Sequence, residues 1–427
     1  MKVLVVGSGG REHAIIRKLK ESKDVTALYC APGNGGIAAD AACVPIKATD
    51  VDAMVAWAAE NAMDYVVVAP DDPLALGMVD ALAAKGIPAF GPTGAAAQIE
   101  ASKVFSKDLM KKYGIPTAAY ETFDDPVKAM RYIHTENKYP VVVKADGLAL
   151  GKGVLICQNE AEAAAAVKEI MQEKKFGASG ARVVVEEFLT GPEVSVLSFT
   201  DGETVVPMVS SMDHKRALDG DEGLNTGGMG TIAPNPYYTP ELAAVCMETI
   251  FKPTVAAMKA EGRPFKGCLY FGLMLTPDGP KVIEYNCRFG DPETQVVLPL
   301  LESDLFTVMR AVTDGTLAQT AVKFSPKSAA CVVLASGGYP EQYETGKPIR
   351  GLEQGQLPGG GATVYHAGTR LEEEVLVTAG GRVLGVTAVA DTLLEAIKDA
   401  YAAAEQIEFE GLHKRGDIGR RALDAQV

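Results

Sequence analysis

The stretch Tyr139-Pro-Val-Val-Val-Lys144-Ala-Asp-Gly147-Leu-Ala-Leu-Gly151-Lys152-Gly153 decides the fold of this chain. It joins two apolar segments, 141–144 and 154–157, that we predict to be paired strands. Its glycines let backbone N–H groups approach an anion closely, and Lys144 can reach a phosphate as a point charge. It is not a Walker A loop, because a strand follows Gly-Lys-Gly where that loop has Ser or Thr and a helix. Such a flap suits a nucleotide that must be covered and released; a plain tight turn, the alternative, would need neither lysine.

A second run, Glu284-Tyr-Asn286-Cys-Arg288-Phe-Gly290-Asp291-Pro292-Glu293, ends another apolar strand. Side chains two residues apart point to the same face of a strand, so Glu284 and Asn286 can offer two hard oxygen ligands to one Mg²⁺. Arg288 follows at the same spacing and can form a fork onto a phosphate or carboxylate. The chain then turns at Gly290-Asp291-Pro292. The alternative is a strand with a polar end and a turn.

Two further motifs add charge near these sites. Acidic residues flank the end of a predicted strand at 182–187, where backbone groups can pair with an adenine edge and Glu193 can accept hydrogen bonds from ribose. Such residues are more often merely solvated. The run Asp213-His-Lys215-Arg216 precedes the glycine-rich string 220–230, and its basic groups can hold a substrate phosphate or carboxylate. An exposed charge run is the alternative. We find neither zinc-ligand spacing nor a Gly-x-Ser-x-Gly elbow.

Residues 1–92 alternate strand and helix patterns, which predicts a parallel, doubly wound sheet with ligands beyond the carboxyl ends of its strands. The first such tip, Gly7-Ser-Gly9-Gly10-Arg11-Glu12, lacks the third glycine of a dinucleotide fingerprint, because position 12 is Glu. We therefore expect a small sugar phosphate at this helix N-terminus. The predicted strands are 2–6, 25–30, 44–46, 65–69 and 87–90, and the predicted helices are 12–20, 51–61 and 74–85.

The rest of the chain is mixed α/β. We expect a helix over 95–113, closed by Gly114 and Pro116, a hairpin around Asp201-Gly202, and a long functional loop over 210–236. Boundaries at 92 and 325 give three domains: an N-terminal α/β substrate domain (1–92), a central domain (93–325, with a lid subdomain at about 117–190) and a C-terminal domain (326–427). Further predicted helices cover 161–174, 241–260, 293–313 and the segment after the capping box at 392–395, and strands cover 268–275, 281–285, 329–335, 363–368 and 383–389.

Composition limits the function. A net charge of −14 argues against nucleic acid or an anionic membrane as a partner. No apolar run approaches the roughly 18 residues of a membrane span, and the N-terminus has no signal-peptide pattern. The seven cysteines form no CxxC pair, so we interpret them as reduced core residues. We expect a cytoplasmic protein, or one in a compartment whose targeting peptide is already removed.

The motifs together resemble the phosphoribosylamine–glycine ligase (glycinamide ribonucleotide synthetase) family of ATP-grasp enzymes in purine biosynthesis. The resemblance runs end to end, and the strings 225–230 and 288–295 are the most specific part of it. The matching segments are Gly7–Ala14, Ala31–Asn34, Lys144–Ala149, Gly151–Gly153, Asp213–Arg216, Asn225–Gly230, Glu284–Gln295 and Gly380–Leu384.

The resemblance implies a central ATP-grasp unit with a mobile lid, and the ligands ATP, Mg²⁺ or Mn²⁺, glycine and 5-phosphoribosylamine. By motif, Lys103, Lys144, Gly151, Lys152 and Gly153 would contact ATP phosphates, while Glu186, the backbone at Phe188 and Leu189, and Glu193 would hold the nucleoside. Glu284 and Asn286 would bind the metal. Lys144, Arg288 and Asp291 are the candidate catalytic residues, Asp291 as a proton acceptor. The expected substrate contacts are Gly9, Gly10, Arg11, Asn34, Asp213, Lys215, Arg216, Asn225, Gly227, Arg288, Gly290, Asp291 and Pro292.

Two departures from the family pattern leave contacts open. Position 72 is Asp and position 69 is Ala, so the sugar-phosphate contacts at Asp71 and Asp72 are undetermined. The strand 267–275 has no carboxylate, so the acidic third metal ligand of many ATP-grasp ligases is missing. Rival readings are a bicarbonate-using ATP-grasp ligase, a nicotinamide oxidoreductase built on 1–92 and a non-catalytic nucleotide-binding regulator. We expect a monomer or weak homodimer.

Overall fold

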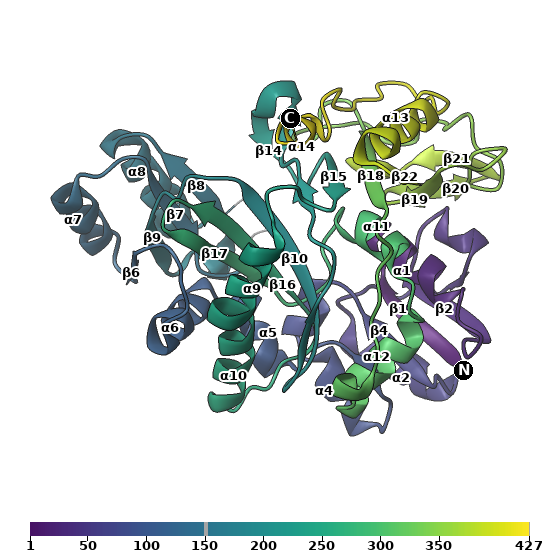
Figure 1. Ribbon diagram of the computed structural model, residues 1–427, viewed down its shortest axis with the longest axis horizontal. Helices are drawn as coiled ribbons and strands as arrows, with labels where there is room; N and C mark the ends of the chain where they lie inside the picture. Colours follow the sequence, from purple (N-terminus) through teal and green to yellow (C-terminus); the bar gives the residue numbers. More distant parts are fainter. Residues whose placement is uncertain (149–152, 427) are drawn as a thin grey trace.

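The N-terminal unit is the predicted parallel sheet, except that the third strand, expected over 44–46, lies at 42–43. A computed structural model describes residues 1–148 and 153–426, and Figure 1 shows this unit in purple beside the N-terminus. The strand order is β3-β2-β1-β4-β5, and all neighbours pair in parallel. The strands are β1 Lys2–Gly7, β2 Ala27–Pro32, β3 Ala42–Cys43, β4 Tyr65–Val68 and β5 Ala89–Phe90, with helices α1 Gly10–Leu19 and α2 Val51–Glu60.

Two predicted helices are each broken in two. The helix expected over 74–85 is split into α3 (Asp71–Ala75) and α4 (Met78–Ala84), because Gly77 adopts a left-handed φ of 81°. The helix expected over 95–113 is split into α5 (Gly94–Ala101) and α6 (Lys103–Tyr113) at Ser102. The extended Ser102 caps α6 by accepting from the Phe105 N–H, and its hydroxyl donates to Asp146 at 2.8 Å. The break places Lys103 at a helix start.

The central sheet has the order β11-β10-β16-β17 and is antiparallel. Its strands are β10 Glu193–Asp201, β11 Val205–Pro207, β16 Lys266–Thr276 and β17 Gly279–Asn286. The hairpin predicted at Asp201-Gly202 is confirmed, as is the helix after Pro240, formed by α9 (Pro240–Cys246), a π-helical turn and α10 (Lys252–Ala260). Phe251 of this helix and Phe271 of β16 belong to one apolar core that continues into the N-terminal sheet through Leu4 and Val66.

A second antiparallel sheet, β6-β9-β7-β8, carries the glycine-rich motif and lies at the left end of Figure 1. β7 and β8 pair as predicted, and part of their loop, with Gly151 and Lys152, lies outside the described residues. The sheet has an apolar core of its own with α7 and α8. Its elements are β6 Tyr120–Phe123, α7 Pro126–Glu136, β7 Val141–Ala145, β8 Val154–Cys157, α8 Glu160–Val167 and β9 Val183–Glu187.

The C-terminal sheet, β12-β15-β18-β22-β19, takes two strands from the segment predicted as a loop at 210–236. That segment contains β12 (Met212–Asp213), β15 (Gly230–Ala233) and a hairpin of β13 (Arg216–Leu218) and β14 (Glu222–Asn225). The loop prediction was wrong because strands of two to four residues are too short to show alternation. The other strands are β18 Ser328–Ala335, β19 Thr363–His366 and β22 Arg382–Ala390, packed by α13 (Leu393–Ala404) with the predicted capping box; a hairpin of β20 (Thr369–Glu372) and β21 (Val375–Thr378) was not predicted.

The helix expected over 293–313 is also interrupted. It consists of α11 (Thr294–Val297), a 3-10 turn over 298–300 and α12 (Leu305–Asp314), whose N-cap is Asp304. Within 1–148 and 153–426, no helix is long and apolar enough to cross a membrane. All seven cysteines are free thiols, and six of them are buried as predicted. Cys43 is exposed, so its interpretation as a core residue was wrong.

Candidate active site

One cavity of about 850 Å³ opens between the lid sheet (β6-β9-β7-β8), the central sheet (β11-β10-β16-β17), the start of α6 and residues 212–227. Most predicted site residues within the described ranges line it: Arg11, Lys103, Lys144, Gly153, Glu186, Phe188, Leu189, Glu193, Asp213, Lys215, Arg216, Asn225, Gly227, Glu284, Asn286, Arg288 and Asp291. Five others are not among the lining residues: Gly9, Gly10, Asn34, Gly290 and Pro292.

A buried charge cluster lies where the lid meets α6. Both Lys144 and Lys107 form ion pairs with Glu186, and the Lys107 pair measures 2.6 Å. The three residues are only 3–5% exposed. Burial alone would raise the pKa of Glu186, but the two ammonium groups outweigh it and the pKa is lowered. Burial lowers the pKa of Lys107 to about 8 although Glu186 opposes the shift. Lys107 was not predicted as a site residue, because it is one of several lysines on a helix.

An apolar slot adjoins this cluster and suits a flat ring. The lid contributes Val142 and Ile156, the central sheet contributes Met274 and Ile283, and Phe188 and Leu189 line the same cavity. Glu193 forms an ion pair with Lys215 at 3.1 Å. The apolar residues on this wall were not predicted from the sequence; the strand-end motif predicted only backbone contacts to an adenine edge and a contact of Glu193 with ribose.

Glu284 and Asn286, at the end of β17, both face the cavity. The Lys215 ammonium lies 3.9 Å from the carboxylate of Glu284. Burial would raise the pKa of Glu284, but Lys215, Lys144 and Lys103 outweigh it and keep the carboxylate ionised. Within the described residues no group of three or more His, Cys, Asp or Glu forms a metal cage. The site fits a cation held by one carboxylate and one amide oxygen, with the remaining positions for ligand and water.

Glu100, on α5, contacts several site residues but was not predicted as a site residue from the sequence. Its carboxylate accepts hydrogen bonds from Asn286 Nδ2 at 2.9 Å and from the Cys287 N–H at 2.7 Å, and it pairs with Arg288 Nη2 at 3.1 Å. Burial opposes the charge on Arg288, yet Glu100 and Asp71 outweigh it and raise the pKa of the guanidinium. The contact joins positions 186 residues apart, so no local pattern could reveal it.

Asp291 sits in a cationic pocket formed by the N-terminal and C-terminal units. Its side chain accepts from Gln295 Nε2 at 2.8 Å, lies 3.5 Å from Arg382 Nη2 and accepts from the Arg11 N–H at 3.4 Å. Burial alone would raise the pKa of Asp291, but Arg382 and Arg11 outweigh it and the pKa is lowered. Arg382 lines the cavity and was not predicted as a site residue.

The start of α1 is occupied by protein carboxylates. The Gly9 N–H donates to the carboxylate of Glu12 at 2.5 Å, and a Cβ on Gly10 would collide with Gln295. Both polar atoms of the Asn34 side-chain amide are hydrogen-bonded within the protein. The NH₂ group donates to the carbonyls of Ser8 and His366 at 2.8 Å, and the oxygen accepts from the N–H groups of Gly36 and Ile37. The geometry therefore gives Asn34 a role in joining the N- and C-terminal units.

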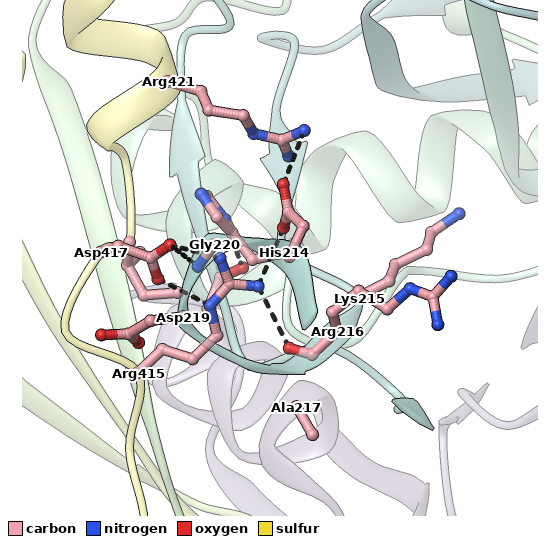
Figure 2. Close-up of polar contacts among 12 residues, drawn as sticks. His214, Lys215, Arg216, Ala217, Asp219, Gly220, Arg415, Asp417 and Arg421 are labelled. Carbon is pink, nitrogen blue, oxygen red and sulfur yellow. Dashed lines mark hydrogen bonds and ion pairs between the residues drawn. The ribbon is translucent and has the colours of Figure 1, made fainter. Parts of the chain in front are cut away.

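The segment that carries Lys215 and Arg216 is clasped by the C-terminal end of the chain. Arg415 is 1% exposed, and its guanidinium pairs with Asp417 at 2.7 Å and with Asp221 at 3.0 Å. Figure 2 shows it reaching the backbone of Arg216, whose carbonyl accepts at 3.1 Å. Buried His214 is held between the Gly230 carbonyl and the Gly419 N–H. These long-range contacts were not predicted either, because they join residues that lie far apart in the sequence.

Two sheets that enclose a polar cavity, one of them a small lid with a glycine-rich loop, define an ATP-grasp protein. Three family models match this chain: phosphoribosylglycinamide synthetase, N domain (residues 1–100), its ATP-grasp (A) domain (101–294) and its C domain (329–421). The chain belongs to the phosphoribosylglycinamide synthetase family.

Relatives named phosphoribosylamine–glycine ligase match the chain over nearly its full length. It is 49% identical to a phosphoribosylamine–glycine ligase of Rhodopirellula baltica over 99% of this chain and 98% of the relative, and 48% identical to one of Caldanaerobacter subterraneus subsp. tengcongensis over 98% and 99%. The crystal structure of the phosphoribosylamine–glycine ligase of Thermotoga maritima matches with a TM-score of 0.86 at 34% identity, covering 98% of this chain and 100% of that one. The biotin carboxylase domain of a Hydrogenobacter thermophilus carboxylase, 18% identical with a TM-score of 0.74 over 97% of this chain and 91% of that one, shares the fold.

Proposed function

We propose that this cavity joins glycine to 5-phosphoribosylamine at the expense of ATP, giving glycinamide ribonucleotide, ADP and phosphate. The observation that carries the proposal is a single cavity with two chemically different ends around Glu284 and Asn286. One end has buried lysines beside an apolar slot, which suits a nucleotide. The other has Arg11, Arg288 and Arg382, which suit carboxylate and phosphate groups.

The nucleotide end prepares phosphoryl transfer. In the proposed arrangement Lys103 and Lys144 lie along the ATP phosphates, and Glu186 and Glu193 hold the nucleoside side. The glycine carboxylate attacks the γ-phosphoryl group in line and forms glycyl phosphate, while Lys144 and Arg288 offset the charge that spreads over the phosphoryl oxygens. Glu284 and Asn286 would hold a divalent cation, which supplies Lewis-acid stabilisation of the phosphates when bound.

The acceptor end completes the reaction. The amine of phosphoribosylamine attacks the carbonyl of glycyl phosphate, and phosphate leaves. Arg11, Lys215 and Arg216 are the proposed contacts for the anionic substrate groups, together with Asn225 and Gly227 on the same wall. Because acyl phosphates hydrolyse, covering of the cavity by the lid protects the intermediate from water.

The proposal also covers the metal ion, the cellular location, the assembly state and the domain boundaries. We propose Mg²⁺, with Mn²⁺ as a substitute, since both are hard cations that favour oxygen ligands. We also propose a cytoplasmic enzyme that acts as a monomer or weak homodimer, with domains at 1–92, 93–325 and 326–427. Sedimentation at rising protein concentration measures the assembly state, and titration of metal-free protein with each cation measures the preference.

An ADP-release assay tests the function directly. Glycine and phosphoribosylamine are each omitted in turn, and the product is identified by mass. We expect sustained ADP release only with both substrates, and formation of glycinamide ribonucleotide in equal amount. Sustained ADP release that needs bicarbonate but not glycine would overturn the proposal in favour of a carboxylating ligase.

A further inference from the structure

Two acidic side chains, Asp213 and Glu293, both line the cavity, and the charge of Glu293 acts on Asp213. Glu293 is 4% exposed, and its carboxylate lies so close to Gly290 that a Cβ there would collide with it. The Tyr270 hydroxyl donates to Glu293 at 3.1 Å and is itself 2.7 Å from the Ser195 hydroxyl. The carboxylate of Glu293 is thus held in one orientation while it faces the substrate cavity.

Burial opposes the ionised forms of both carboxyl groups. Burial raises the pKa of Glu293, and burial followed by the charge of Glu293 raises the pKa of Asp213 well above its usual range. The charged and titratable groups that act on the pair from the neighbouring elements are Lys215, Arg288, Arg382 and Tyr270. The cations moderate the shifts without reversing them.

Asp291, the acceptor expected from the sequence, has the opposite environment. It is paired with Arg382, held by Gln295 and placed at the N-terminus of α1, all of which stabilise its ionised form. A carboxylate whose pKa is lowered in this way is a weak base. Its contacts suit a residue that orients Arg382 and Arg11.

The ligation step requires a base. As the nitrogen lone pair forms the C–N bond, the C–O bond to phosphate breaks with its electron pair on the phosphate oxygen, and the nitrogen must lose one proton. We propose that Glu293, oriented by Tyr270, accepts this proton. The inference rests on the proposed function, because it assigns a residue to that reaction's second step.

The test separates the two steps in the variant Glu293→Gln, which keeps the size of the side chain. Glycine-dependent positional oxygen exchange within ATP reports glycyl phosphate formation, and amide formation reports the second step. We expect a loss of about 100-fold or more in the rate of amide formation, the usual contribution of a general base, with the exchange retained. The control Glu302→Gln alters an exposed glutamate outside the cavity and should leave both rates unchanged.

A second variant keeps the test decisive if Glu293→Gln folds poorly. Tyr270→Phe removes the hydrogen bond that favours the ionised form of Glu293, so the acidic limb of the kcat–pH profile should move to higher pH. Equal loss of exchange and amide formation in folded Glu293→Gln, or an acidic limb unmoved in Tyr270→Phe, would overturn the assignment. Wild-type enzyme that makes no glycinamide ribonucleotide would instead refute the proposed function itself.

Discussion

The side-chain amide of Asn286 donates to Oε1 of Glu100 at 2.9 Å, and the same oxygen lies 3.1 Å from the guanidinium of Arg288. One carboxylate on α5 therefore fixes both the proposed metal-binding amide and the arginine that follows it. Asn286 is left with its amide oxygen free to face a cation. The strand end is thus oriented by a helix that lies far away in the sequence.

We predict that Glu100→Gln raises the concentrations of metal and glycine needed for half-maximal rate, because the neutral amide holds Asn286 and Arg288 less firmly. Hydrogen bonds to a charged group contribute about 1.5–3 kcal/mol, so the free energy of unfolding should also fall. Initial rates at varied Mg²⁺ and glycine, with thermal unfolding, measure both effects. Unchanged metal and glycine dependence would show that Glu100 does not orient these residues. Glu121→Gln, at an exposed site on β6, is the control.

Lys107→Met should weaken ATP binding and destabilise the lid. The substitution removes one of two ammonium groups from buried Glu186, and breaking a buried ion pair costs about 3–5 kcal/mol. Denaturant unfolding and the KM for ATP measure the two consequences. Lys111→Met, on the exposed side of the same helix, should change neither by much. Equal behaviour of the two variants would contradict a role for Lys107 in the nucleotide end.

The sequence was sufficient for the elements that carry strong local patterns. The parallel strands of residues 1–92, the β7–β8 flap and the Glu284/Asn286 spacing are all set by neighbours a few positions apart. It failed where a helix is interrupted by a single capping residue, as at Ser102, since the apolar pattern continues through the break. It also missed Glu100, Lys107, Arg382 and Arg415, whose partners are brought near only by tertiary packing.

Acidification should loosen the contact between the N- and C-terminal units. The backbone N–H of His366 donates to Nδ1 of the His13 ring at 2.8 Å. The other ring nitrogen of His13, Nε2, lies 3.0 Å from the carboxylate of Asp40. Burial lowers the pKa of His366 to about 3 and lowers the pKa of His13. Because the unfolded chain binds protons near pH 6.5 and the folded chain does not, stability is full above that pH and falls as pH decreases below it.

For His366 the loss amounts to about 2 kcal/mol between pH 8 and pH 5. Urea unfolding at a series of pH values measures the slope. The variant His366→Asn, which cannot titrate, should show a shallower dependence over this range even if its stability at pH 8 is lower. A slope identical to wild type would mean that His366 is not held neutral in the folded protein.

Arg415→Met should impair use of phosphoribosylamine more than formation of glycyl phosphate. The substitution leaves Asp221 and Asp417 without their shared guanidinium and releases the Arg216 carbonyl, so the β13–β14 hairpin loses its anchor to the C-terminal segment. Arg216 and Asn225 pair within that hairpin and line the acceptor side of the cavity. A looser hairpin therefore raises the KM for the amine, whereas the KM for ATP depends mainly on lid and central-sheet residues.

The comparison with Arg420→Met, an exposed arginine a few residues on, separates anchoring from a general effect of lost charge. Arg415→Lys keeps the charge but cannot bridge two carboxylates and a carbonyl at once, so it should recover stability better than it recovers the KM for phosphoribosylamine. Steady-state kinetics with each substrate varied in turn distinguishes these cases. If Arg415→Met raised the KM values for ATP and phosphoribosylamine by the same factor, the contacts of Arg415 with Asp221, Asp417 and the Arg216 carbonyl would serve stability alone.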